Sequence, residues 1–150
     1  MKKILGLLLL AAITFSCTSN SSKAEENKEI KKEVQAKKVD ISGKYTILEL
    51  NGVNLKSKDF GKKMPMILLD GEKMSYSTNI GCNQIGGSYT LEGNSIKFLS
   101  GMSTMMACPD KLEANYILAL SEVDNYKIEN FMLKAYKGDE LKIIFQPLKR

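Results

Sequence analysis

The sequence predicts a mainly β (α+β) fold: a compact, barrel-like antiparallel structure of about eight strands with one packed α-helix. Short runs rich in β-branched and aromatic residues recur at close spacing, and glycine-containing turn signals separate them. One stretch changes to helical spacing and is followed by further strand-like runs. A length of 150 residues suits one such domain with additional segments.

The chain begins with a segment of the secretory type. Two lysines precede an apolar run from Ile4 to Phe15, which is shorter than the roughly 20 residues of a membrane-spanning helix. The run ends with a small residue before Cys17, which resembles the lipobox of bacterial lipoproteins, although Thr14 stands where those proteins usually have Leu. We therefore expect residues 1–16 to be a signal peptide and Cys17 to be lipidated. An ordinary secretory peptide, with Cys17 left as a thiol, is the alternative.

Residues 17–38 are expected to form a flexible charged linker behind the lipidated cysteine. Between residues 18 and 38 there are six Lys and four Glu, with too few apolar residues to form a core. From Val39 onward the chain has 14 basic and 13 acidic residues. The domain predicted over residues 39–148 is therefore nearly neutral, and we expect no nucleic-acid partner.

Five strands are predicted in the first part of the domain. They are Tyr45–Leu50, Met64–Leu69, Lys73–Thr78, Ser88–Leu91 and Ser95–Leu99. Turn signals follow three of them, at Asn51-Gly52, Asp70-Gly71 and Glu92-Gly93-Asn94. In the third strand, Met74 and Tyr76 are expected on one face.

A single amphipathic helix is predicted from Pro109 to Val123. Its apolar residues have helical spacing: Leu112, Tyr116, Ile117, Ala119, Leu120 and Val123. Pro109 suits a first helical turn, and Asp110 and Glu113 are acidic where the helix dipole favours negative charge.

Three more strands are expected after the helix. They are Tyr126–Ile128, Phe131–Tyr136 and Leu141–Phe145. In the second of them, Phe131, Leu133 and Ala135 alternate with more polar residues, as in an antiparallel strand with one buried face. The last two strands are joined through Lys137-Gly138-Asp139-Glu140.

The cysteine count predicts a disulfide. If Cys17 carries lipid, Cys82 and Cys108 remain as a pair in an oxidising compartment. A bridge between them would stabilise the domain by roughly 3–4 kcal/mol in the chain-entropy model. Two buried, unpaired thiols are the alternative.

The order of motifs resembles the META domain family, which includes the HslJ-like heat-inducible lipoproteins. The resemblance rests on Gly81-Cys82-Asn83, Gly87-Ser88-Tyr89 and the Ser-Thr-Met-Met-Ala-Cys stretch that ends at Cys108, with Glu113 in the helix behind it. It covers about Val39 to Gln146. It implies a twisted antiparallel barrel with one helix, and links to heat shock, the cell envelope, secretion and antibiotic tolerance without an established reaction. Tyr45 stands where the family often has Trp.

The residue inventory argues against catalysis. The chain has no histidine, which excludes Ser-His-Asp and Cys-His catalysis and histidine-ligated metals. No carboxylate or lysine pair stands out by its spacing. We expect no catalytic residues, no cofactor and no metal, with a carboxylate- or lysine-based enzyme as a distant alternative.

The motif residues Gly81, Asn83, Gly87, Thr104 and Glu113 are interpreted as structural. Asn83 is expected to bond local backbone in a turn where glycines supply positive φ, with a ligand-contacting loop as the alternative. Thr104 is expected to bond backbone ahead of the helix, and Glu113 to accept first-turn amides or pair with a lysine.

The methionines near Cys108 allow three interpretations. Met102, Met105 and Met106 could fill the core beneath the helix, line a plastic hydrophobic pocket for peptide or lipid, or bind Cu(I) through soft thioethers. Core filling is preferred, and a ligand pocket is the second choice.

Together these features predict a non-catalytic, lipid-anchored envelope protein that acts as a binding or assembly module in envelope or stress maintenance. The alternative is a structural envelope stress protein without a defined ligand. We expect a monomer, anchored by its N-terminal lipid to the outer membrane and facing the periplasm or the cell surface, with an envelope protein or a hydrophobic ligand as partner. An apolar groove would favour the binding module, whereas a closed, packed barrel would argue against it.

Overall fold

The structure, a computed structural model, describes residues 39–60, 64–109 and 111–148. The expected signal peptide, Cys17 and the expected linker lie outside these residues. The described elements, in chain order, are β1 (Gly43–Leu50), β2 (Val53–Asn54), β3 (Met66–Asp70), β4 (Ser75–Asn79), β5 (Gln84–Glu92), β6 (Ser95–Leu99), α1 (Leu112–Glu122), β7 (Asn125–Glu129), β8 (Met132–Lys137) and β9 (Glu140–Pro147). No helix among the described residues is long and apolar enough to cross a membrane.

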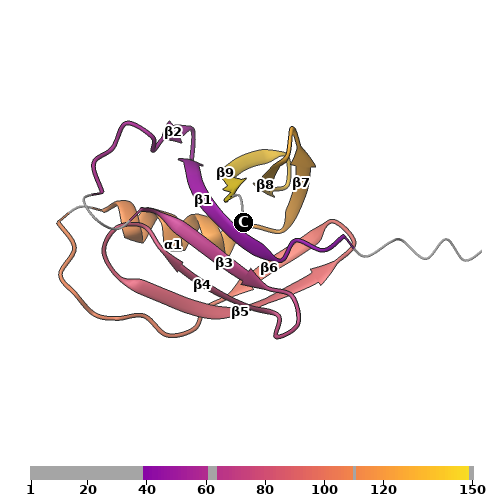
Figure 1. Cartoon of the computed structure of the whole chain (residues 1–150), viewed down its shortest axis with the longest axis horizontal. Coiled ribbons are helices and arrows are strands. Elements are labelled where there is room, and N and C mark those ends of the chain that lie inside the picture. Colours follow the sequence, from indigo (N-terminus) through magenta and orange to yellow (C-terminus); the bar gives the residue numbers. More distant parts are fainter. Residues whose placement is uncertain (1–38, 61–63, 110, 149–150) are drawn as a thin grey trace, which may run out of the picture. The chain divides into compact units, whose positions relative to one another are not determined.

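Eight of the strands close into an antiparallel barrel, which confirms the predicted fold class (Figure 1). The hydrogen-bonded order runs β1-β3-β4-β5-β6-β7-β8-β9, and β9 pairs back with β1. The short β2 folds back on β1 across Asn51-Gly52, whose φ values of 48° and 79° suit this turn sequence. Closing the barrel pairs the backbone groups that an open sheet would leave at its edges.

The barrel interior is filled by side chains from every part of the sheet and from α1. The largest fully buried side chains are Ile47, Ile67, Leu69, Thr78, Tyr89, Ile96, Tyr116, Ile143 and Phe145. Aromatic rings pack edge to face inside, with the ring centroids of Tyr76 and Phe98 5.3 Å apart. Tyr45, at the position where the family often has Trp, is also buried, and its hydroxyl donates to the Ile41 carbonyl at 2.8 Å.

The helix packs near the two strands of the barrel that share the fewest paired residues, β6 and β7. The β6 and β7 strands share one registered residue pair, Ser95 with Asn125, and α1 contacts β6 and β9. Tyr116 is fully buried, and its hydroxyl shares a 2.8 Å hydrogen bond with the Thr78 hydroxyl of β4. Burial raises the pKa of Tyr116 far above its ordinary value, so this hydroxyl stays neutral.

Several predicted boundaries are wrong: β5 begins at Gln84 rather than Ser88, and β3 begins at Met66 rather than Met64. The helix begins at Leu112 rather than Pro109, so Pro109 precedes it, while Asp110 lies outside the described residues. The third strand begins at Ser75 rather than Lys73, because Met74 has a φ of +50° and belongs to the turn after β3. Met74 still packs against the core, as its apolar side chain requires.

Phe131 is not on the buried face of its strand, as its alternation with Leu133 and Ala135 suggested. It lies in the two-residue turn between β7 and β8, with a φ of +62°, and its side chain is 91% exposed. Leu133 and Ala135 are buried as expected. The alternation of buried and exposed side chains in β8 therefore begins at Leu133 rather than at Phe131.

Candidate functional site

The motif residues meet at one end of the barrel, where the β4–β5 connection lies against the start of α1. Gly81 has a φ of +102°, and a Cβ atom there would lie 2.8 Å from a ring carbon of Phe60. Glycine is therefore required both by the backbone conformation and by the aromatic ring. Phe60 is a contact that the sequence motif did not indicate.

Gly86 and Gly87 do not form the expected turn. Both lie inside β5 without positive φ. A Cβ atom on Gly87 would overlap the Leu99 carbonyl oxygen and lie 2.8 Å from the ring of Tyr76. Gly87 therefore allows close packing of Leu99, at the end of β6, and of the Tyr76 ring against β5.

Asn83 is the centre of the site and is only 4% exposed. Its side-chain oxygen accepts the Thr104 hydroxyl and the Met106 amide, each at 2.8 Å. Its side-chain nitrogen donates to the Met106 carbonyl at 3.2 Å and to the Glu113 carboxylate at 2.8 Å. The expected bonding to local backbone is wrong, because these partners lie 21 to 30 residues farther along the chain.

Glu113 is buried in the first turn of α1, and Asn83 supplies its hydrogen-bond donors. The backbone N–H of Asn83 donates to one carboxylate oxygen at 2.6 Å, and the side-chain Nδ2 of Asn83 donates to the other at 2.8 Å. Within the described residues no lysine pairs with Glu113, and its backbone donor is Asn83 rather than an amide of the first helical turn, so neither expected partner is found. Its place in the first turn adds favourable interaction with the helix dipole.

Cys82 and Cys108 form a disulfide beside this network, with an S–S distance of 2.08 Å. Both residues are half-buried. The side-chain nitrogen of Asn83 lies 3.1 Å from the Cys108 sulfur, so the covalent bridge and the polar network share one residue.

Thr104 anchors the chain that leads to the helix. Its hydroxyl accepts the Gln84 amide at 3.1 Å and donates to Asn83. The Thr104 backbone amide donates to the Gln84 carbonyl at 3.1 Å. Two residues away on each segment, the Gly86 amide donates to the Met102 carbonyl. This chain therefore continues the β6 pairing along β5 beyond the end of the named strand.

The sulfur and carboxylate atoms of Cys82, Cys108 and Glu113 lie within 4.8 Å of one another, which raises the question of a metal. The two sulfurs are bonded to each other and are not thiolates. Both oxygens of the carboxylate already accept hydrogen bonds from Asn83. In its disulfide form, this set does not suit a metal ion.

The methionines neither fill the core nor line a pocket. Met102, Met105 and Met106 are 87%, 98% and 50% exposed, in the segment 101–109 that we call the methionine loop. None of the three lines any of five of the best-formed cavities among the described residues. A neighbouring cavity of about 100 Å³, lined by Ile85, Gly101 and Ile117 among others, is too small for a peptide.

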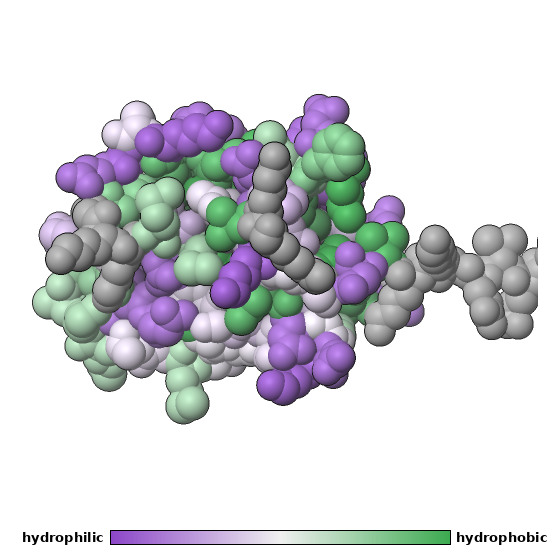
Figure 2. Space-filling model, viewed as in Figure 1, coloured by the Kyte–Doolittle hydropathy of each residue, from purple (hydrophilic) through white to green (hydrophobic). Residues whose placement is uncertain are grey.

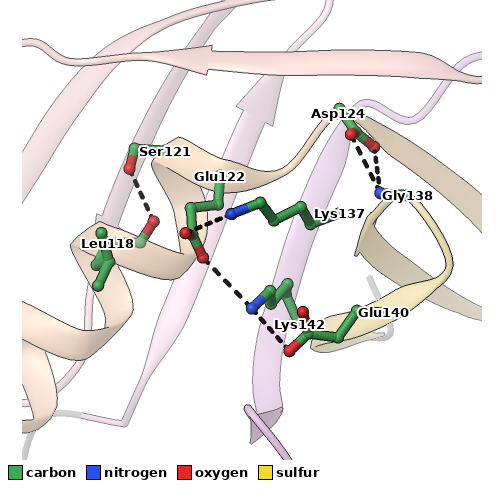
Figure 3. A network of polar contacts seen from close by, with 8 residues as sticks. All are labelled: Leu118, Ser121, Glu122, Asp124, Lys137, Gly138, Glu140 and Lys142. Atoms are coloured by element: carbon green, nitrogen blue, oxygen red, sulfur yellow. Dashed lines mark hydrogen bonds and ion pairs between the residues drawn. The ribbon is translucent and has the colours of Figure 1, made fainter.

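A second polar network fastens the other end of α1 (Figure 3). Lys137 donates to one oxygen of Glu122 at 2.7 Å, and Lys142 lies 3.3 Å from the other. Both oxygens of Asp124 accept the Gly138 amide, at 3.0 and 3.1 Å. The lysine hydrogen bonds lower the pKa of Glu122 below its ordinary value.

The family comparison fits this arrangement. A META domain model matches residues 38–147. The chain belongs to the META domain family.

Solved structures share the fold at low sequence identity. An NMR structure of a protein from Burkholderia xenovorans is 17% identical and covers 73% of this chain and 83% of its own, with a TM-score of 0.57. A DUF4847 family protein from Bacteroides vulgatus is 13% identical and covers 73% and 94%, with a TM-score of 0.52. A further NMR structure is 20% identical and covers 71% and 89%, with a TM-score of 0.55. No curated protein matches the chain in sequence.

Proposed function

We propose that this protein is a non-catalytic envelope lipoprotein whose META domain binds or assembles another protein through the methionine loop. One observation carries this proposal: three methionine side chains face solvent, while the backbone beneath them is fastened at several points. Asn83 holds both the amide and the carbonyl of Met106, and Thr104 pairs with Gln84.

A rigid loop with exposed thioethers suits recognition better than stability. Exposed methionines contribute little to the domain core, whereas flexible, polarizable side chains adapt to varied apolar partners. Loops presented by a rigid scaffold are also frequent sites of binding. The filled barrel argues against a ligand inside it, so the proposed partner is bound on the outer surface.

The proposed anchor sets the reach of the domain. If Cys17 carries lipid, the 22 residues from Cys17 to Lys38 could extend roughly 70 Å at full stretch. A structural envelope protein without a partner is the second candidate, and the closed, packed barrel favours it.

Site-specific photo-crosslinking in cells tests the binding proposal. A photoreactive residue at position 105 should give a defined protein adduct, which disappears when Met102 and Met106 are replaced by serine. The same residue at Val53, which is 60% exposed, is the matched control. Equal patterns at positions 105 and 53 would support the structural alternative.

Fractionation tests the anchor separately. Cys17→Ser should move the protein from the membrane fraction to the soluble fraction. Retention in the membrane pellet would contradict lipidation at Cys17.

A further inference from the structure

The turn between β7 and β8 carries a residue that the fold does not favour. Asn130 and Phe131 have φ values of 51° and 62°, the left-handed conformation of a tight hairpin turn. Asn tolerates this region and glycine suits it, whereas a bulky side chain is strained there. Phe131 is nevertheless 91% exposed, so burial within the domain does not offset the strain.

The strand that leads into this turn, β7, lies beside the start of the described chain. Val39, the first described residue, lines the same surface concavity as Lys127, Ile128 and Glu129 of β7. Val39 is 44% exposed and Ile128 is 51% exposed. We call Val39, Ile128 and Phe131 the apolar tip. Figure 2 shows hydrophobic surface over the β7–β8 hairpin and near the start of the described chain.

The apolar tip and the methionine loop lie at different ends of the domain. In Figure 1 the segment leading from β6 to α1 is at the left, whereas the indigo start of the described chain and the β7–β8 hairpin are toward the right. The hairpin from Asn125 to Lys137 has three Lys and one Glu, but Lys134 pairs with Glu129 and Lys137 pairs with Glu122, so its charge is largely compensated. The protruding aromatic side chain, rather than the charge, suits the headgroup region of a lipid bilayer.

We propose that the apolar tip docks onto the lipid bilayer that carries the anchor, with Phe131 inserted at the headgroup level. The inference rests on the proposed anchor at Cys17, because the polypeptide preceding Val39 leads from this end of the domain to that cysteine. A bilayer needs no complementary pocket, and an inserted phenylalanine would add a second attachment to that of the lipid. The methionine loop then faces away from the membrane, toward its partner.

The absence of tryptophan from the chain provides a clean test. Single-tryptophan variants of the full, lipidated chain, Phe131→Trp and Met105→Trp, are reconstituted into vesicles of phosphatidylethanolamine and phosphatidylglycerol with nitroxide-labelled acyl chains. Trp at 131 should be blue-shifted and quenched by the nitroxide lipid. Trp at 105, equally exposed but on the methionine loop, should emit as in water and remain unquenched.

Each other outcome contradicts the inference in a recognisable way. Vesicle-bound protein with an unquenched Trp at 131 would overturn tip docking and leave the anchor intact. A blue shift without lipid quenching would indicate a protein partner or a second copy of the chain. If the chain does not bind vesicles at all, the anchor proposal fails; coupling Cys17 to a maleimide lipid then still tests the tip, because the other two cysteines are bridged.

A binding measurement without the anchor provides a second readout. Protein that begins at residue 17, with Cys17→Ser and without the expected signal peptide, should bind the same vesicles weakly, and adding Phe131→Ser should weaken binding by about tenfold or more, since a buried phenylalanine contributes that much to partitioning. Equal binding with and without Phe131 would overturn the inference.

Discussion

The two ends of α1 carry the same charged side chain in different settings. Glu113 lies in the first turn and Glu122 at the last helical position. Glu113 is buried and accepts from one asparagine, whereas Glu122 is partly exposed and contacts two lysines. The difference follows the helix dipole, which favours an anion at the N-terminus and opposes one at the C-terminus.

The helix dipole explains why a neutral residue, Asn83, can stabilise Glu113 at the N-terminal end of α1. At the first turn, the dipole and two N–H donors stabilise the Glu113 carboxylate without a cation. At the last turn, α1 has no basic residue of its own, and the β8–β9 region supplies Lys137 and Lys142 instead. The buried end requires exact partners because unpaired groups there cannot be solvated.

The largest expected effect is at the buried end. Asn83→Ala removes the side-chain donor to Glu113 and both side-chain contacts with the Met106 backbone, while the backbone N–H of residue 83 can still donate to Glu113. We therefore expect the free energy of unfolding to fall by about 3–4 kcal/mol. Urea denaturation measures this loss. Asn79→Ala is the matched control, because its side chain accepts one long bond of 3.4 Å from Gly81, and it should change stability by less than about 1 kcal/mol. Similar losses in both variants would show that Asn83 is not the centre of the network.

The disulfide should come second. Replacing Cys82 and Cys108 by serine should lower the free energy of unfolding by roughly 3 kcal/mol, mainly because the unfolded chain gains conformational entropy without the bridge. The Asn83 bonds to Thr104 and Glu113 should survive, since they do not require the bridge. Amide exchange at Asn83 and Met106 checks this, and loss of protection at both without global unfolding would contradict it.

The sequence was sufficient for the barrel because that prediction rests on repeated patterns. Alternation, turn glycines and one helical stripe recur along the chain, so single errors did not change the fold class. Phe131 shows the limit: it continued an alternating pattern, yet a two-residue turn placed it outside the barrel. Turn conformation depends on backbone angles that alternation does not report.

The candidate site was harder to predict, because its contacts join distant segments. Asn83, Thr104 and Glu113 were each singled out, but their mutual bonds span up to 30 residues. The methionines were misplaced for a related reason. Their apolar character predicted burial, whereas Thr104 and Asn83 hold the backbone of their loop at the surface.

The smallest expected effect is at the exposed end. Because lysine hydrogen bonds lower the pKa of Glu122 from its ordinary 4.5, its contribution to stability is present above that value and is lost as the pH falls through the lowered pKa. Glu122→Gln should therefore reduce stability slightly at neutral pH, and the difference from the unmodified protein should vanish in acid and shrink in high salt. Urea midpoints across pH and salt measure this. A difference that persists unchanged in acid would mean that Glu122 acts by packing rather than by charge, and the contrast between the two ends of α1 would then lie in burial alone.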